Sequence, residues 1–220
     1  MEQTASSTTN RAHRRQLGFS MVEVLVSVFI VAIGLLGIAG LQFMSKRSNF
    51  EAVQRTTATL LASDIVERIR ANPTQLIEYG GSAGAPIPVL GGPTPTRSAP
   101  GADCSVNPCS TFELSQYDLW QWETALNGMS DGGGSGGLTA STACLSTDAA
   151  AGVTDRSGNY TVAIAWRGST QLANPVAPDA AAPDADAFTC GEGSGKYNGE
   201  DGSVDTHRRV LVITTYISAN

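Results

Sequence analysis

Two features near the N-terminus have residue types and a spacing that could support chemistry: the peptide bond between Gly18 and Phe19, and the carboxylate of Glu23. Behind them, Val24 to Phe43 form an apolar run of about 20 residues. As a helix this run would be about 30 Å long, which matches the hydrocarbon core of a membrane. A carboxylate at the edge of such a span is unfavourable to bury and usually has a function.

The stretch before the span differs from an ordinary secretory leader. Such a leader is cut after its apolar region, whereas the small-residue junction here, Gly18 to Phe19, precedes it. Cleavage at this bond would remove residues 1–18 and keep the apolar helix. Three arginines and one glutamate give the leader a formal charge of +2, so its removal changes the net charge from −6 to −8. A chain this acidic is not expected to bind nucleic acid.

The pattern of Gly18, Phe19 and Glu23, with basic residues before it and the apolar run behind it, resembles the type IV prepilin signature. The resemblance implies that a prepilin peptidase cuts after Gly18 and methylates the new amine of Phe19. It also implies that Glu23 faces an N-terminal amine in the filament core, where an unpaired charge would be strongly destabilising. The alternative is an ordinary single-span anchor with Glu23 at the membrane interface.

The four cysteines, Cys104, Cys109, Cys144 and Cys190, all follow the span, in a region rich in glycine and proline. Disulfides in an oxidising periplasm suit such a region. Three pairings are possible and the sequence alone cannot choose among them, although we favour Cys104 with Cys109 and Cys144 with Cys190. A zinc site is the alternative, but there is no CxxC pair and His207 is the only histidine after the leader. We therefore expect neither a metal nor another cofactor.

The helix is predicted to continue past the span from Phe19 to Asn72, because Pro73 disfavours the α conformation at the preceding residue. Its second half has apolar residues at helical spacing and charged residues largely elsewhere around the axis. The predicted apolar stripe consists of Phe50, Val53, Thr57, Leu60, Leu61, Ile65 and Ile69. One helix would therefore serve two environments, lipid or neighbouring helices first and a globular domain second.

The remainder of the chain is predicted to hold a short helix and a small antiparallel sheet. Tyr117 to Leu126 indicate the helix, with Trp120 and Trp122 as core anchors rather than a recognition patch. Strands are predicted from Tyr160 to Trp166 and from Val210 to Ile217, paired antiparallel.

Loops are predicted between these elements. Residues 80–101 are expected to be a surface loop and residues 131–137 a flexible turn. The segment from 167 to 209 is rich in polar and breaker residues and is expected to hang off the sheet edge, tethered by Cys190.

The expected fold class is α+β, a pilin fold in which a long N-terminal helix packs on a small antiparallel sheet with long, disulfide-stapled loops. The expected segments are a leader at 1–18, a transmembrane and filament-core helix at 19–45, an amphipathic helix at 46–72 and a periplasmic globular domain at 73–220. An enzyme is not expected, because His207 is the only candidate base and no phosphate-binding glycine loop is present.

Within type IV pilins the chain resembles the PilV family of minor pilins. The resemblance rests on the stretches IVAIGLLGIAGLQ, ASDIVERIRANP, YDLWQW and RRVLVITTYI. It implies a low-abundance subunit of the complex that primes assembly at the pilus tip and so supports adhesion and twitching motility. The implied partners are the prepilin peptidase, other minor pilins, the major pilin and a tip adhesin. The implied location is the inner membrane, with the N-terminus cytoplasmic, and then the pilus.

Two other functions remain open. A minor pseudopilin of type II secretion would share the N-terminal motif, although it would typically be shorter. A periplasmic binding or sensor protein on a single-span anchor would keep its leader, and Trp120 and Trp122 could then line its ligand site.

Overall fold

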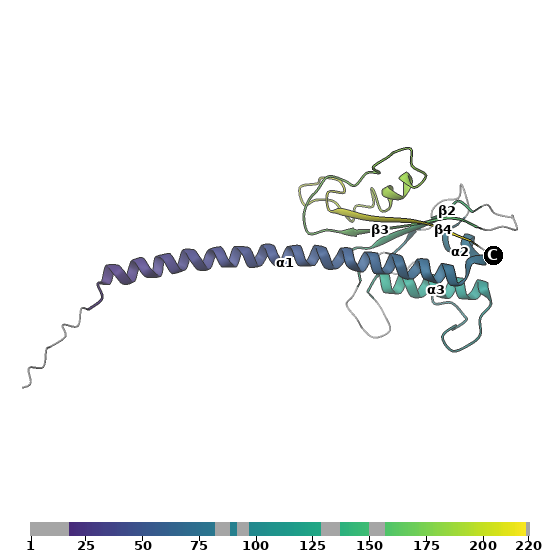
Figure 1. Ribbon diagram of the computed structural model, residues 1–220, viewed down its shortest axis with the longest axis horizontal. Helices are drawn as coiled ribbons and strands as arrows, with labels where there is room; N and C mark the ends of the chain where they lie inside the picture. Colours follow the sequence, from purple (N-terminus) through teal and green to yellow (C-terminus); the bar gives the residue numbers. More distant parts are fainter. Residues whose placement is uncertain (1–17, 82–88, 92–96, 129–136, 150–156, 219–220) are drawn as a thin grey trace, which may run out of the picture. The chain divides into compact units, whose positions relative to one another are not determined.

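The computed structural model describes residues 18–81, 89–91, 97–128, 137–149 and 157–218 (Figure 1). The chain divides into two compact units, residues 1–46 and residues 47–220. Most of the predicted leader and nearly all of the predicted turn at 131–137 lie outside the described residues.

The helix α1 (Met21–Ala71) is 51 residues long and contributes to both units. It begins after Ser20, whose carbonyl accepts the N–H groups of Glu23 at 3.0 Å and Val24 at 3.3 Å. It ends at Ala71, one residue before the predicted end at Asn72, and it starts two residues later than predicted. The helix is continuous through its three glycines, because no proline interrupts its backbone hydrogen bonds.

The buried face of α1 differs from the predicted stripe. Ile65 and Ile69 are buried as predicted, but Phe50, Val53 and Leu60 are 42%, 59% and 65% exposed. The face that packs into the core is instead made of Gln54, Ala58, Ala62, Ile65, Val66 and Ile69. Small alanine side chains allow the core elements to approach the helix closely, and the prediction missed this by counting only large residues.

Among the described residues, four antiparallel strands form one sheet in the order β1-β2-β3-β4. The strands are β1 (Val89–Leu90), β2 (Thr142–Thr147), β3 (Gly158–Arg167) and β4 (Arg208–Ile217). The predicted pairing of the last two strands is confirmed, with Ala163 opposite Val212. β2 was not predicted.

The prediction of a surface loop at 80–101 is wrong at residues 89–91, whereas residues 97–101 are irregular and largely exposed. Val89 and Leu90 form β1 against β2, and Leu90 is only 2% exposed. The buried carboxylate of Glu123 accepts the backbone N–H groups of Gly91 at 2.9 Å and Arg97 at 3.0 Å. The segment therefore packs against the core because its backbone finds strand and carboxylate partners there.

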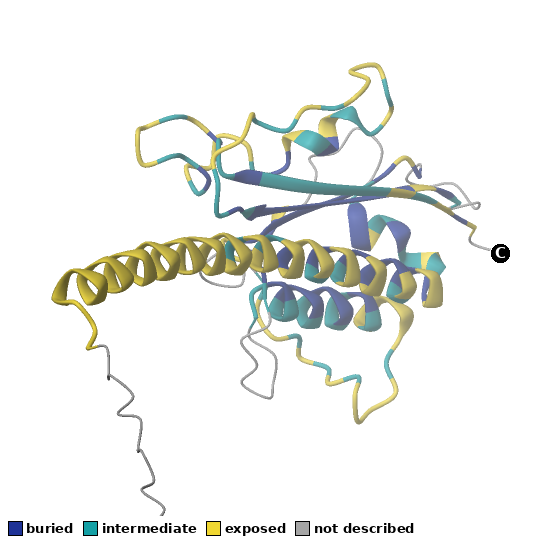
Figure 2. Cartoon of the chain, turned by 60° about the vertical axis from the view of Figure 1, so that its left-hand side comes forward, coloured by how far each residue is buried: buried dark blue, intermediate teal, exposed yellow. Residues whose placement is uncertain are grey.

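The helix α3 (Thr111–Leu126) lies beside the second half of α1 (Figure 2). It begins six residues before the predicted start, because Ser110 and Glu113 form a capping box at its N-terminus. Trp122 is fully buried and donates its indole N–H to the carbonyl of Leu61 in α1 at 2.8 Å. Trp120 is partly exposed. The prediction of a core anchor is therefore confirmed for Trp122, which holds α3 to α1, but not for Trp120.

A short connection follows α1 and joins the same core. It consists of η1 (Pro73–Gln75) and α2 (Leu76–Gly80). The hydroxyl of Tyr79 donates to Asp118 in α3 at 2.5 Å, and Arg68 of α1 pairs with the same carboxylate at 3.1 Å. Burial, followed by the hydrogen bond to Asp118, raises the pKa of Tyr79 well above its ordinary value. This network connects α1, α2 and α3 through one acid.

Both faces of β3 are buried, by different parts of the chain. The bulky face, with Tyr160, Val162, Ile164 and Trp166, belongs to the main core together with α1 and α3. On the other face, Ala163 packs with Ala187 and with the Cys144–Cys190 pair.

The segment predicted to hang off the sheet edge therefore covers a face of the sheet instead. It contains η2 (Ala185–Thr189), and its middle part is held by Arg208, whose side chain is fully buried. Arg208 donates to the carbonyls of Pro175, Phe188 and Cys190 at 3.1, 2.6 and 2.9 Å. These hydrogen bonds join residues far apart in the sequence and decide where the segment lies. The amino-acid composition of the segment does not reveal them.

Candidate functional site

The bond between Gly18 and Phe19 lies in an open stretch of backbone just before α1. Gly18, Phe19 and Ser20 are not helical and are exposed, and Phe19 is 83% exposed. A Cβ atom added at Gly18 would meet no atom within 4 Å. Nothing within the described chain therefore requires glycine at this position, and the requirement must come from whatever binds the bond.

Glu23 lies in the first turn of α1. A carboxylate there is favoured by the helix dipole, an effect of about 0.3–1 kcal/mol. Its side chain makes no hydrogen bond or ion pair with any described residue. The acid is thus positioned by the helix but has no partner in the part of the isolated chain that the structure describes.

The residues that follow Glu23 present an apolar surface. Among the described residues, α1 is the one helix whose length and composition suit a membrane span, with a mean hydropathy of 2.8 in its most apolar window. None of that window is buried within the chain. Val24, Leu25 and Phe29 are each more than half exposed, so lipid or other helices must cover them.

Two family comparisons match this region and its continuation. The prokaryotic N-terminal methylation motif matches residues 13–39, which include Gly18, Phe19 and Glu23. The type IV pilin family described as Tt1218 matches residues 40–120, from the middle of α1 to within α3. The chain carries the segments of a type IV pilin. No curated protein and no solved structure is significantly similar to it.

The methylation motif of this pilin implies processing by a prepilin peptidase and assembly with other pilins. Type IV pilins are structural subunits, and this chain matches their family models. Its His207 Nδ1 lies 2.9 Å from the carbonyl of Gly168. No group of three or more potential metal ligands occurs among the described residues.

The cysteines of the pilin form two disulfides, Cys104–Cys109 and Cys144–Cys190, which is the pairing we favoured from the sequence. The second joins β2 to the segment that covers the sheet. These bonds stabilise the unit at 47–220 and do not form a reactive site, because no free cysteine is present among the described residues.

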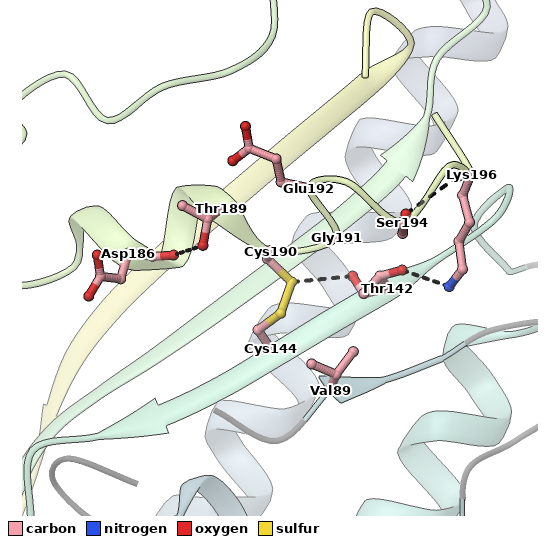
Figure 3. Close-up of a pocket in the computed structure, with 10 residues that line it drawn as sticks. All are labelled: Val89, Thr142, Cys144, Asp186, Thr189, Cys190, Gly191, Glu192, Ser194 and Lys196. Atoms are coloured by element: carbon pink, nitrogen blue, oxygen red, sulfur yellow. Dashed lines mark hydrogen bonds between the residues drawn. A yellow bond between two sulfur atoms is a disulfide. The ribbon is translucent and has the colours of Figure 1, made fainter. Parts of the chain in front are cut away.

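A cavity of about 350 Å³ lies beside the Cys144–Cys190 disulfide (Figure 3). Lys196, which lines it together with the acids Asp186 and Glu192, donates from Nζ to Thr142 Oγ1 at 2.9 Å, and burial lowers the pKa of this amine. The neighbouring Tyr197 donates to the carbonyl of Ala140 at 2.9 Å, and burial raises its pKa to about 12. Sequence reasoning missed both residues, which tie a glycine-rich loop to β2 rather than hold a ligand.

Proposed function

We propose that this pilin is a minor subunit of the PilV type, which acts with other minor pilins in the complex that primes pilus assembly at the tip. The observation that carries the proposal is Glu23, an acid without a described partner in the first turn of an exposed apolar helix. In a filament core, this carboxylate gains a partner in the N-terminal amine of Phe19, either its own or that of a neighbouring subunit.

The proposed segments follow from this role. Residues 1–18 are the leader that is removed, and 19–45 anchor the chain in the inner membrane before they join the filament core. Residues 46–72 carry the globular domain at 73–220, which remains periplasmic until assembly. The major pilin, other minor pilins and a tip adhesin are the proposed partners, and adhesion and twitching motility are the proposed outcomes.

The first test concerns processing at Gly18. Gly18→Arg should leave the full-length precursor in the inner membrane, because the peptidase requires a small residue before the bond that it cuts, whereas the described chain itself has room for a larger side chain there. Mass spectrometry of the N-terminus measures the outcome. Normal cleavage and methylation in this variant would refute the prepilin interpretation.

The second test concerns Glu23 and measures cleavage and assembly separately. Glu23→Ala and the isosteric Glu23→Gln should be cleaved normally but be depleted from sheared pili. Ser27→Ala is the matched control, since Ser27 lies one turn further on and its hydroxyl bonds only to the carbonyl of Val24 in the same helix. Wild-type incorporation of both Glu23 variants would contradict the charge-pairing role. Deletion of the gene, with pili and secreted enzymes scored together, distinguishes a pilus subunit from a pseudopilin.

A further inference from the structure

The outer edge of β4 is open in the part of the chain that the structure describes. β4 is the last strand of the described sheet, and among the described strands it pairs with β3 alone. Apart from that ladder, no backbone hydrogen bond between described residues involves positions 210–217. Alternate residues of an antiparallel edge strand direct their N–H and C=O groups outward, where another strand can pair with them.

The composition of this edge does not protect it. Natural edge strands usually carry a proline, a charge or a bulge that discourages pairing. From Val210 to Ile217 there is no charged residue and no proline. Val210, Leu211, Val212 and Ile213 are all only partly buried. The edge therefore has both the backbone groups and the apolar side chains that an added strand needs.

A cavity of about 570 Å³ lies at the start of this edge, within the unit at 47–220. Its lining includes Ala52 from α1 and Val210 and Leu211 from β4. The segment at 167–209, which covers one face of the sheet, contributes Leu172 and Pro175. Leu172 is 56% exposed. An apolar side chain next to β4 would find contacts on three sides here.

The charge in the same cavity is predominantly positive. Arg55 is exposed, and its guanidinium makes no hydrogen bond or ion pair with a described residue. Arg209 donates to the carbonyl and hydroxyl of Thr170 at 2.7 and 2.9 Å, and its closest carboxylate is Glu51, at 3.8 Å. Oε1 of Glu51 already accepts the N–H and hydroxyl of Ser169. The indole N–H of Trp166, in the cavity wall, is buried without an acceptor among the described residues. The guanidinium of Arg55 and the indole N–H of Trp166 thus lack an acceptor among the described residues, and an acceptor with negative charge would suit both.

We propose that the cavity and the edge of β4 form one docking site for an extended segment of another protein, which adds to β4 as a further strand and places a carboxylate beside Arg55 and Arg209. The charge complementarity selects an acidic partner strand. A second copy of β4 does not fit, because the strand from Arg208 to Ile217 contains no acidic residue. The site goes beyond the proposed tip role and does not depend on Gly18 or Glu23.

The test uses the full-length mature chain in detergent and three labelled peptides of eight residues. The first alternates valine and threonine around one central glutamate, the second has glutamine in its place, and the third is the first peptide with alternate backbone nitrogens methylated. We expect the glutamate peptide to bind and the glutamine peptide to bind about tenfold more weakly, which corresponds to about 1.4 kcal/mol. The methylated peptide, which cannot pair along a strand, should not bind.

Variants of the chain assign the contact to its residues. Arg55→Gln should reduce binding of the glutamate peptide to the level of the glutamine peptide, whereas Arg55→Lys should retain most of it. Lys46→Gln is the control, because Lys46 is an exposed basic residue of α1 that does not line the cavity. Bound peptide should also slow amide hydrogen exchange at residues 210–216.

Three results would each overturn the proposal. The first is that the glutamate peptide does not bind at a concentration of about 1 mM. A dissociation constant of that size corresponds to a binding free energy of only about 4 kcal/mol. The second is that the glutamine peptide or the methylated peptide binds as tightly as the glutamate peptide. The third is binding that leaves the exchange of β4 unchanged. None of these results bears on cleavage or on incorporation into pili.

Discussion

The two disulfides should differ in how strongly they stabilise the unit at 47–220. Cys104 and Cys109 are separated by 5 positions in sequence, and Cys144 and Cys190 by 46. In the chain-entropy account, a cross-link stabilises by restricting the unfolded chain, more so for the longer loop. That account assigns about 2 kcal/mol to the short loop and about 4 kcal/mol to the long one.

The surroundings of the two bonds increase this difference. Cys144 and Cys190 are 6% and 4% exposed and pack with Ala163 and Ala187 on the outer face of the sheet. The stretch around Cys104 is largely exposed. Removal of the longer bridge should therefore also loosen the segment over the sheet, although Arg208 still holds three of its carbonyls.

The assay compares two double variants, Cys144→Ala with Cys190→Ala and Cys104→Ala with Cys109→Ala, in the mature chain in detergent. Urea unfolding followed by tryptophan fluorescence reports on this unit, because Trp122 and Trp166 are buried in its core. We expect the first pair to lose about twice as much free energy of unfolding as the second. Equal losses, or a larger loss for the Cys104 pair, would refute the reasoning.

Two further predictions concern α3. Trp122→Phe should lower the free energy of unfolding by about 1–2 kcal/mol, because it removes the hydrogen bond to Leu61 and leaves a small void, whereas Trp120→Phe, at a partly exposed site, should change it much less. The reverse ranking in urea unfolding would contradict the anchoring role of Trp122. Hydrogen bonds from the backbone N–H and hydroxyl of Ser110 hold the pKa of Glu113 below its ordinary value of 4.5. Since an acid with a lowered pKa stabilises the fold when ionised, its contribution is complete above pH 4.5 and is lost as the pH falls through the lowered pKa. The stability difference between the wild type and Glu113→Gln should be constant above pH 4.5 and shrink below it, and a difference that persists unchanged under acid would exclude this cause.

The elements that sequence reasoning predicted are those whose signals are local. The end of α1 follows from the proline at position 73, and β4 follows from a run of β-branched residues. The alternation along β3 identified its bulky face correctly. In each case the residues that decide the structure lie within the element or next to it.

The features that were missed depend on distant partners. β2 contains small residues such as Ala143 and Cys144, whose burial comes from pairing with β1 and β3 rather than from their own pattern. β1 has two residues and exists only through its ladder with β2. Similarly, a composition typical of a loop could not reveal that Arg208 would bury its guanidinium beneath that loop.

The candidate site could be predicted from the sequence because its residues are close neighbours along the chain. Gly18, Phe19 and Glu23 lie within six consecutive residues, so their spacing does not depend on how the globular domain folds. The structure adds that Gly18 and Phe19 are exposed and that Glu23 has no partner within the described chain. Since the apolar residues behind Glu23 are also exposed, the N-terminal helix is incomplete on its own, and its apolar surface requires lipid or other helices to cover it.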